Sequence, residues 1–387
     1  MRFQFPQAFI STGEILLFSR RQYRTTFSFK DLVIRETTKR GVKPTVEQLQ
    51  FGKFYTDHML YATWTLESGW DELVIKPVEP FSVHPGNRTF HYSSSCFEGA
   101  KVMRGVDNVI RIFRFEENIK RLNKSTTRLC LPNVDLVECI KSVKRLIQLD
   151  QDWVPSGPNT ALYVRPAMIA TDSFLGVHAP TAAAFFVLLC PVGYYYANGP
   201  KPVSLLADPQ FVRSWPGGTG DTKIAANYAS TPFVQQIAQN HDCQQTLWLY
   251  GPDEQVTEVG TMNFFIALKE LVTAPLDGLI LPGVTRASVL ELATSWGDIK
   301  VSERVITMPE IIKAQKEDRV IEAFGTGTAC VISQVEGFRY RGDRIQIPVG
   351  DMNSPSSITG RIYKELSDIQ YGRVTPHPWT SCIEDIE

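Results

Sequence analysis

A segment rich in glycine, proline and tyrosine, PVGYYYANGPKPV at residues 191–203, separates two β-rich halves of the chain. Such a composition is typical of a connection between domains, because glycine and proline interrupt regular structure. The chain of 387 residues also exceeds the roughly 250–300 residues at which a single core stops growing. We therefore predict an N-terminal extension at 1–28, a smaller domain at 29–191, a linker at 192–202 and a larger domain at 203–387, with a cleft between the domains.

Both helices and strands are expected on each side of this segment. Residues 116–129 and 135–149 are predicted helices, because apolar side chains recur in them at helical spacing. The runs LYVRPAMIA and AAAFFVLLCPVG are rich in strand formers and are interrupted by proline or glycine, which favours a mixed sheet. After the linker, residues 224–239 read as one apolar helix, and TLWLYGPDEQVTEVGTMNFFIAL indicates two strands around a turn. The expected fold class is α/β (α+β) with two domains.

Charge and cysteine content restrict the partners. With 40 basic and 41 acidic side chains, the net charge of −1 gives no attraction for nucleic acid or for an anionic membrane, so we expect small-molecule partners. The longest strongly apolar run, residues 182–190, is about half as long as a membrane span.

The 7 scattered cysteines indicate reduced thiols in an intracellular compartment. No spacing typical of a metal site occurs, so no metal is expected.

The first 28 residues carry four arginines, Arg2, Arg20, Arg21 and Arg24, against a single acid, Glu14. This composition is typical of an import presequence, although a frayed N-terminal tail explains it equally well. We therefore expect a mitochondrial or cytoplasmic protein, with the arginine content slightly favouring mitochondria.

The stretch SWPGGTGDTKIAANYAS places Lys223 between a glycine-rich turn and a run of small residues. The stretch is not a P-loop, since Thr222 and Ile224 stand where that motif needs Gly and Ser or Thr; the dinucleotide fingerprint needs glycine at position 223 itself. A lysine among small residues, beside a cationic or electron-poor group, can lose its proton and form a Schiff base. Pyridoxal phosphate needs such a lysine, an acid for its ring nitrogen, and amides with an arginine for its phosphate.

Candidates for the acid and the arginine are present. Glu258 lies among strand formers in QVTEVGTMNFF, where a carboxylate must be paired; a solvated glutamate at a turn is the alternative. Arg121 lies on the side of a predicted helix that is expected to be exposed. The default interpretation is a solvated charge, and only a phosphate beside it would give it another role.

Two turns are candidate anion sites. In LPGVTRASVLELATSW a Pro-Gly turn precedes an apolar helix, so the free amides of Val284 and Thr285 suit a phosphate. The second turn, FGTGTAC, offers Thr328 and the amide of Ala329 to another anion. Each signal alone is weak, because Gly-Thr turns are common and usually structural.

The order of these residues resembles that of the fold-type IV pyridoxal-phosphate aminotransferases, and specifically the eukaryotic-type branched-chain amino acid aminotransferases. The resemblance covers about residues 27–375 and rests on Arg121, Tyr163, Arg165, Lys223, Tyr228, Glu258, Gly283-Val284-Thr285 and Gly327-Thr328-Ala329. It extends to the longer motifs FGKFYTDHM, FEGAKVMRGVDN, QQTLWLYG, TEVGTMN, FGTGTAC and DIQYGR. It implies a smaller N-terminal α/β domain, a larger C-terminal domain with a barrel-like sheet, and an active site at the domain junction.

The resemblance also implies a role for each residue. Lys223 would hold pyridoxal 5'-phosphate and, once released, move protons. Tyr228 would contact the phenolic oxygen of the cofactor, and Glu258 its ring nitrogen. The residues implied at the phosphate are Arg121, Val284, Thr285 and Thr328. Thr261, beside the cofactor, and the amide of Ala329 would lie at or near the substrate carboxylate.

The implied substrate pocket is aromatic, with walls formed by Tyr55, Tyr92, Phe97, Tyr163 and Tyr195. Leu175 and Val177 would come from the second subunit of a homodimer. Arg165 would be the counter-charge for the second carboxylate of 2-oxoglutarate or glutamate. The implied reaction is a reversible ping-pong transfer of the amino group of L-leucine, L-isoleucine or L-valine to 2-oxoglutarate, in branched-chain amino acid biosynthesis or catabolism.

Some alternatives stay open at this point. D-amino acid aminotransferase and aminodeoxychorismate lyase have the same fold, and a non-catalytic descendant is a further alternative. The sequence also departs from the mammalian pattern, which has CxxC after the Gly-Thr turn, because Cys330 is followed by Val331, Ile332 and Ser333. Redox regulation by such a pair is therefore not expected, and Cys330 is interpreted as a small buried residue.

Overall fold

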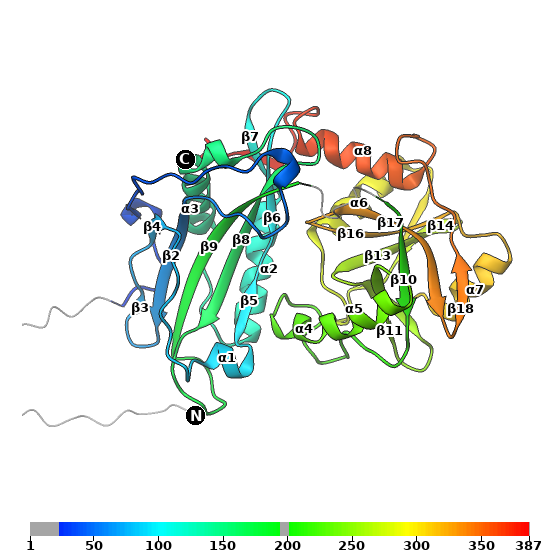
Figure 1. Ribbon diagram of the computed structural model, residues 1–387, viewed down its shortest axis with the longest axis horizontal. Helices are drawn as coiled ribbons and strands as arrows, with labels where there is room; N and C mark the ends of the chain where they lie inside the picture. The colour runs from blue at the N-terminus through cyan, green and yellow to red at the C-terminus, as the bar shows by residue number, and fades with distance from the viewer. Residues whose placement is uncertain (1–22, 194–200, 387) are drawn as a thin grey trace, which may run out of the picture.

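The computed structural model describes residues 23–193 and 201–386, and the described chain is organised around two β-sheets (Figure 1). Most of the predicted extension at 1–28, and most of the predicted linker at 192–202, lie outside the described residues. The strands of the first sheet come from residues 33–192 and 380–382, and those of the second sheet come from residues 203–346.

The first sheet has ten strands and is mainly antiparallel. Its order is β1 (Val33–Ile34), β4 (Val74–Pro77), β2 (His58–Thr65), β9 (Ala182–Val192), β8 (Ala161–Ala170), β6 (Ala100–Arg104), β7 (Ile110–Phe113) and β19 (Thr380–Cys382). Off this path, β3 (Gly69–Trp70) pairs with β2, and β5 (Ser95–Phe97) pairs with β8. The longest strands, β8 and β9, pair in register from Ala161↔Val192 to Ala170↔Ala183, so they form the centre of the sheet.

Two amphipathic helices, α2 (Phe115–Arg128) and α3 (Leu136–Leu149), pack on this sheet. The α3 helix begins where the side chain of Asp135 accepts a 3.0 Å hydrogen bond from the amide of Glu138, which satisfies one free amide of the first turn. Their apolar faces, including Ile119, Leu122 and Leu146, share one core with the sheet. The short elements of this half are α1 (Arg88–Tyr92), η1 (Phe29–Asp31), η2 (Val46–Gln48) and η3 (Gln151–Trp153).

The second sheet has nine strands, six of which close into a barrel. The closed ring runs through β12 (Gln255–Val259), β11 (Gln245–Tyr250), β10 (Val203–Ala207), β17 (Val331–Tyr340), β16 (Glu322–Gly327) and β13 (Met262–Ala267), and β13 pairs back with β12. The remaining strands are β14 (Glu270–Thr273), β15 (Lys300–Glu303) and β18 (Asp343–Gln346). The helices of this half are α4 (Ala226–Ala229), α5 (Thr231–Asn240), α6 (Val284–Trp296), α7 (Met308–Lys316) and α8 (Ile358–Gln370). This closed sheet confirms the barrel-like C-terminal half expected from the resemblance.

A third apolar core joins the two sheets. Phe113 and Tyr163 from the first half pack with Phe265, Phe324 and the α8 residue Leu366 from the second. In Figure 1, α8 runs along the upper side of the barrel toward the first sheet. The chain then returns, and β19 pairs antiparallel with β7. The strand β19 belongs to the predicted second domain, 203–387, but it pairs with the sheet of the first half. The domain limits stay a prediction.

The apolar segment 224–239 was expected to be a single helix, and this prediction is wrong. The structure has two helices there, α4 and α5, which meet at Ser230. Pro232 lies in the first turn of α5, where its missing N–H is tolerated; in a continuous helix it would leave the carbonyl four residues earlier without a donor. No helix within residues 23–193 and 201–386 is long and apolar enough to cross a membrane.

Candidate active site

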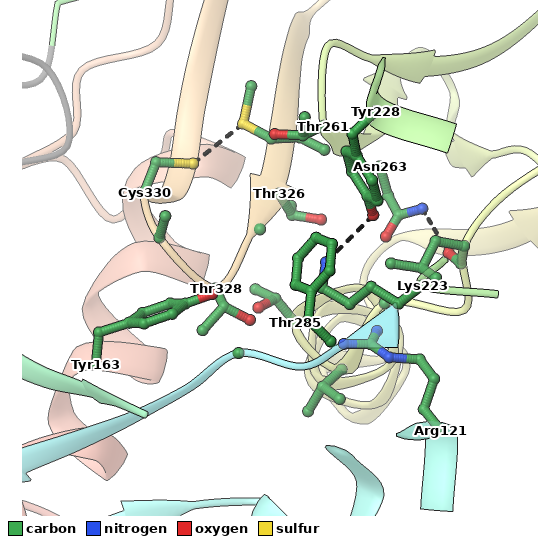
Figure 2. Close-up of a pocket in the computed structure, with 18 of the residues that line it drawn as sticks. Arg121, Tyr163, Lys223, Tyr228, Thr261, Asn263, Thr285, Thr326, Thr328 and Cys330 are labelled. Atoms are coloured by element: carbon green, nitrogen blue, oxygen red, sulfur yellow. Dashed lines mark hydrogen bonds between the residues drawn. The ribbon is translucent and has the colours of Figure 1, made fainter. Parts of the chain in front are cut away.

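A cavity of about 240 Å³ lies where the two sheets meet (Figure 2). Its walls come from both halves of the chain, so neither half would form it alone. The residues expected at the site that do line it are Phe97, Arg121, Tyr163, Arg165, Lys223, Tyr228, Thr261, Val284, Thr285, Thr328 and Ala329. Sequence reasoning thus found much of the wall before the fold was known.

Lys223 is attached to the first half through its backbone. Its amide donates a 2.9 Å hydrogen bond to Ser125 Oγ on α2, and its carbonyl oxygen accepts a 3.1 Å hydrogen bond from the amide of Phe97. The next residue, Ile224, forms an isolated β-bridge with Cys96. The chain around Lys223 therefore runs along the edge of β5, and this path directs the side chain into the cavity.

The amine of Lys223 lies between aromatic groups. Its Nζ donates a 3.3 Å hydrogen bond to the hydroxyl of Tyr228 (Figure 2). The same Nζ is 4.9 Å from the ring centroid of Phe97. The rings of Phe97 and Tyr228 are themselves 5.1 Å apart. An amine held in this way has one hydrogen-bond partner and little freedom to move. A group that reacts with a bound molecule needs such a fixed position.

The glycine-rich turn before Lys223 is needed for close approach. Gly217 has a φ of 79°, a conformation that favours glycine. A Cβ on Gly220 would lie 2.6 Å from the Cβ of Ser214 and 2.7 Å from the carbonyl oxygen of Leu279, so a larger residue would push the turn away. Asn227 fixes the turn from the other side, because its Nδ2 donates to the carbonyl oxygen of Thr222 at 3.0 Å.

Glu258 is fully paired inside the protein. It is 2 % exposed, and its Oε1 accepts hydrogen bonds from Asn263 Nδ2 at 3.0 Å and from the amide of Leu281 at 2.9 Å. Its Oε2 lies 2.5 Å from Nε of Arg213, which is also buried. Burial raises the pKa of the Glu258 carboxyl, and the guanidinium of Arg213 opposes that rise. The carboxylate thus lies one contact behind the cavity wall, which Asn263 and Leu281 line.

Arg121 is buried rather than solvated, which corrects the exposed position that its place on a helix suggested. Its Nε and Nη2 donate to the two carboxylate oxygens of Glu98 at 2.6 and 2.8 Å, and its Nη1 donates to the carbonyl oxygen of Pro282 at 2.8 Å. Glu98 is completely buried. Burial alone would raise the pKa of Glu98, but Arg121 outweighs this and holds the pKa below its usual range. The bidentate pair fixes the guanidinium at the edge of the cavity.

Two backbone features of the cavity wall offer hydrogen-bond donors to the cavity. Val284 and Thr285 line the cavity at the start of α6, where the first amides of a helix have no partner within the helix. The turn 328–330 between β16 and β17 lines the same cavity. Thr326, at the end of β16, is 1 % exposed, and its hydroxyl has no hydrogen-bond partner among the described residues. Such a hydroxyl is free to bind a water molecule or a polar ligand in the cavity.

The other end of the cavity is aromatic and carries one cation. Nη2 of Arg165 donates a 3.3 Å hydrogen bond to the hydroxyl of Tyr163, and its guanidinium lies 4.6 Å from the ring centroid of Phe97. The ring of Phe51 packs edge-on against Tyr163 at 4.8 Å. This end can therefore enclose an apolar chain and still offer a charge to a carboxylate.

Some predicted residues do not line the cavity of the single chain. Tyr55 and Tyr92 are exposed, as are Leu175 and Val177, which were expected to act on a partner subunit. The hydroxyl of Tyr92 donates to the carbonyl oxygen of Leu175, so these residues belong to one surface region. Tyr195 lies outside the described residues.

Sequence reasoning missed several residues of the site. Asn263 is part of the quoted motif TEVGTMN, and Phe51 begins FGKFYTDHM, so the signal for both was present. Glu98 lies in FEGAKVMRGVDN, but only the fold brings its carboxylate to Arg121. Arg213 had no signal beyond its place just before the glycine-rich turn. Within the described residues, no group of three or more His, Cys, Asp or Glu side chains is placed to hold a metal ion.

Comparison with protein families finds that residues 95–337 match the family described as amino-transferase class IV. The branched-chain-amino-acid aminotransferase of the cytosol of Ovis aries is 47% identical over 365 residues, covering 92% of this chain and 94% of the relative. The mitochondrial branched-chain-amino-acid aminotransferase of Bos taurus is 46% identical over 379 residues, covering 96% of each chain.

Solved structures agree in fold. The branched-chain amino acid aminotransferase of Escherichia coli superimposes with a TM-score of 0.66 at 22% identity, covering 85% of this chain and 99% of that one. The branched-chain aminotransferase of Thermoproteus uzoniensis, solved with norvaline, gives a TM-score of 0.67 at 22% identity, covering 84% of this chain and 99% of that one. At such identities the likeness concerns the fold.

Proposed function

Because the chain belongs to the class IV aminotransferase family, we propose that it is a pyridoxal 5'-phosphate enzyme that transfers the amino group of L-leucine, L-isoleucine or L-valine to 2-oxoglutarate. The products are the branched 2-oxo acid and L-glutamate. The observation that carries this proposal is the position of the Lys223 amine, hydrogen-bonded to Tyr228 at 3.3 Å in a cavity that also contains the fixed guanidinium of Arg121.

The residues around the cavity fit the cofactor. Arg121, Arg165 and Lys223 line the cavity, and none of its described lining residues is an aspartate or a glutamate, so the site suits an anionic phosphate. The unpartnered hydroxyl of Thr326 and the first amides of α6 add neutral donors on the same side. We assign the phosphate to Arg121, Val284, Thr285 and Thr328, and we add Thr326 to these residues.

The roles of the remaining residues follow from their contacts. When bound, the cofactor supplies an electrophilic aldehyde and a ring that accepts electrons. Burial raises the pKa of Glu258, and the guanidinium of Arg213 opposes that rise, so this pairing favours the carboxylate form that would accept a hydrogen bond from the ring nitrogen. The amine of Lys223 takes the proton from the α-carbon of the amino acid, and the hydroxyl of Tyr228 keeps that amine in place.

Substrate choice follows from the aromatic end of the cavity. Phe51, Phe97 and Tyr163 enclose an aliphatic chain, and Arg165 pairs with the second carboxylate of 2-oxoglutarate or glutamate. The α-carboxylate lies at Thr261 and the amide of Ala329. A difference of one methylene in such a pocket is worth only about 1–3 kcal/mol, so leucine, isoleucine and valine are all substrates.

The active form is a homodimer in this proposal. Phe174, Leu175 and Val177 are 55%, 61% and 86% exposed, which is unusual for neighbouring apolar side chains on one loop. In the dimer, Leu175 and Val177 of the partner subunit close the pocket. Sedimentation of the purified protein at micromolar concentration tests this, and a monomer that retains full activity would contradict it.

The compartment is intracellular. The related proteins include cytosolic and mitochondrial forms, and the arginine-rich segment 1–28 favours import into mitochondria. Fusing residues 1–28 to a fluorescent protein tests this assignment, because a cytosolic signal would contradict import.

The activity is tested with the purified protein, pyridoxal 5'-phosphate, 2-oxoglutarate and one amino acid at a time. Glutamate should form with L-leucine, L-isoleucine and L-valine at rates within about 100-fold of one another, the range that one methylene allows. D-alanine should give no pyruvate. Turnover of D-alanine in place of L-leucine would instead indicate a D-amino acid aminotransferase.

A further inference from the structure

Lys101 extends from the first sheet to the back of the cavity wall. It lies on β6 in register with Tyr163 of β8, and its Nζ donates a 2.7 Å hydrogen bond to the carbonyl oxygen of Ala329. Ala329 belongs to the turn 328–330 of the second sheet and lines the cavity. A single ammonium group thus connects the two halves of the chain directly behind this turn.

The charge of Lys101 has no counter-ion in the described part of the chain, where no carboxylate lies within ion-pair distance of its Nζ. Cys330 is the one neighbour that favours the ammonium form, but burial raises the pKa of this thiol to about 11, so it is neutral at physiological pH. Burial lowers the pKa of Lys101 itself to about 8. Removing a cation from water without an anion costs free energy, and an anionic ligand bound nearby would offset that cost.

We propose that Lys101 is the positioning residue through which the enzyme recognises the α-carboxylate of its substrates. This inference rests on the proposed function, in which the amide of Ala329 meets that carboxylate. By holding the carbonyl oxygen of Ala329, Lys101 fixes the orientation of the backbone in the turn. Its positive charge lies behind the amide that receives the anion, so it also attracts the carboxylate electrostatically.

Lys101 and Arg165 serve different carboxylates in this account. The guanidinium of Arg165 lies over Phe97 and is hydrogen-bonded to Tyr163, at the aromatic end where the side chain of the substrate is placed. Lys101 acts at the turn, which every substrate must meet with its α-carboxylate. Loss of Lys101 should therefore affect leucine and 2-oxoglutarate alike, whereas loss of Arg165 should affect only the dicarboxylic substrates.

The direct test is a calorimetric titration of the holoenzyme with two unreactive ligands of the same shape, 4-methylpentanoate and its uncharged amide. In Lys101→Met, a side chain of similar length without charge, the carboxylate should bind at least about 10-fold more weakly, the loss expected for a charged hydrogen bond. The amide should bind within about two-fold of its wild-type affinity. Lys313→Met, which removes an exposed lysine on α7, is the matched control and should change neither affinity.

Steady-state kinetics give a second readout. The KM values for L-leucine and for 2-oxoglutarate should both rise about 10-fold in Lys101→Met, with a smaller change in kcat. Lys101→Arg keeps the charge and should recover part of the loss. Affinity for pyridoxal 5'-phosphate should fall less than affinity for the carboxylate, because Thr328 is the only residue of this turn among those assigned to the phosphate.

Two results would overturn the inference. Equal weakening of the carboxylate and the amide, with a lower Tm, would mean that Lys101 only supports the fold. A KM increase confined to 2-oxoglutarate would assign Lys101 to the second carboxylate instead. Failure of the proposed function is a separate result, because it would appear in the wild-type protein as an absence of transamination.

Discussion

Nε of Arg213 lies 2.5 Å from Oε2 of Glu258, and the two side chains are 5% and 3% exposed. The sequence indicated that a carboxylate at position 258 must be paired, and the structure provides an internal cation for it. Burial of a carboxyl without a cation favours its protonated form, and a neutral acid gives no negative charge to stabilise a protonated ring nitrogen. Arg213 therefore favours the carboxylate form of Glu258, which is the form that would pair with a protonated ring nitrogen of the cofactor.

Arg213→Met should remove this cation and leave Glu258 buried and protonated. Breaking a buried ion pair costs about 3–5 kcal/mol, so the free energy of unfolding should fall by several kcal/mol. Affinity for pyridoxal 5'-phosphate, measured by fluorescence quenching, should also fall. The double variant Arg213→Met/Glu258→Gln should recover stability but not activity. Unchanged cofactor affinity in Arg213→Met would contradict the role given to this pair.

Glu98→Gln should loosen the guanidinium of Arg121, because an amide cannot accept both of its hydrogen bonds. Hydrogen bonds to charged groups contribute about 1.5–3 kcal/mol each, so urea unfolding of the apoprotein should show a loss in this range or above it. Dissociation of pyridoxal 5'-phosphate should become faster. A matched change on the surface, Glu117→Gln on α2, should have little effect, since Glu117 has only an exposed partner. Equal effects of the two substitutions would be inconsistent with the buried role of Glu98.

Thr326→Val should separate stability from binding. The hydroxyl of Thr326 has no partner among the described residues, so its replacement by a methyl group should leave the apoprotein as stable as before or stabilise it by about 1–3 kcal/mol. Cofactor affinity should fall, because the hydroxyl is assigned to the phosphate. Thermal unfolding with and without pyridoxal 5'-phosphate measures both effects. A destabilised apoprotein with normal affinity would show that the hydroxyl has a structural partner instead.

The low pKa of Glu270, on β14, should make the folded second half less stable in acid. Its carboxylate accepts a hydrogen bond from Ser302 and pairs with Lys300 and Arg304, which lowers its pKa to about 2. In the unfolded chain the pKa returns to about 4.3, so the unfolded state binds more protons between these values. Stability contributed by Glu270 is therefore complete above the unfolded pKa and is lost as the pH falls toward 2.

The comparison of wild type with Glu270→Gln tests this sign. Between pH 6 and pH 3, the free energy of unfolding should fall more in the wild type, by on the order of 1 kcal/mol after allowance for solvent screening. Urea unfolding at the two pH values measures the difference. If the free energy of unfolding depends on pH in the same way in both proteins, Glu270 does not cause the loss of stability in acid.

The sequence predicted the candidate site best where its residues are neighbours in the chain. The glycine-rich turn and Lys223 lie together in the chain, as do the Pro-Gly turn and the first amides of α6, so their local geometry could be inferred from residue types. Contacts between distant segments could not be inferred in this way. The pairs Glu98–Arg121 and Arg213–Glu258 each join residues that are far apart in the chain but belong to the same half, so each pair forms only when that half folds.

The errors have similar causes. Arg121 looked solvated because helical position alone does not show that a buried glutamate lies against that face. The segment 224–239 looked like one helix because its composition is apolar, but Pro232 divides it. Tyr55 and Tyr92 are exposed in the single chain, and their place in the substrate pocket stays a prediction.

The central claim is that the amine of Lys223 is the group that bonds covalently to the aldehyde of pyridoxal 5'-phosphate. The direct measurement is borohydride reduction of the purified protein with this cofactor, followed by peptide mass spectrometry. The account predicts one stable phosphopyridoxyl group, located on Lys223 and absent when Lys223→Ala is treated in the same way. A modified lysine elsewhere in the chain, or no fixed cofactor in an active enzyme, would contradict it.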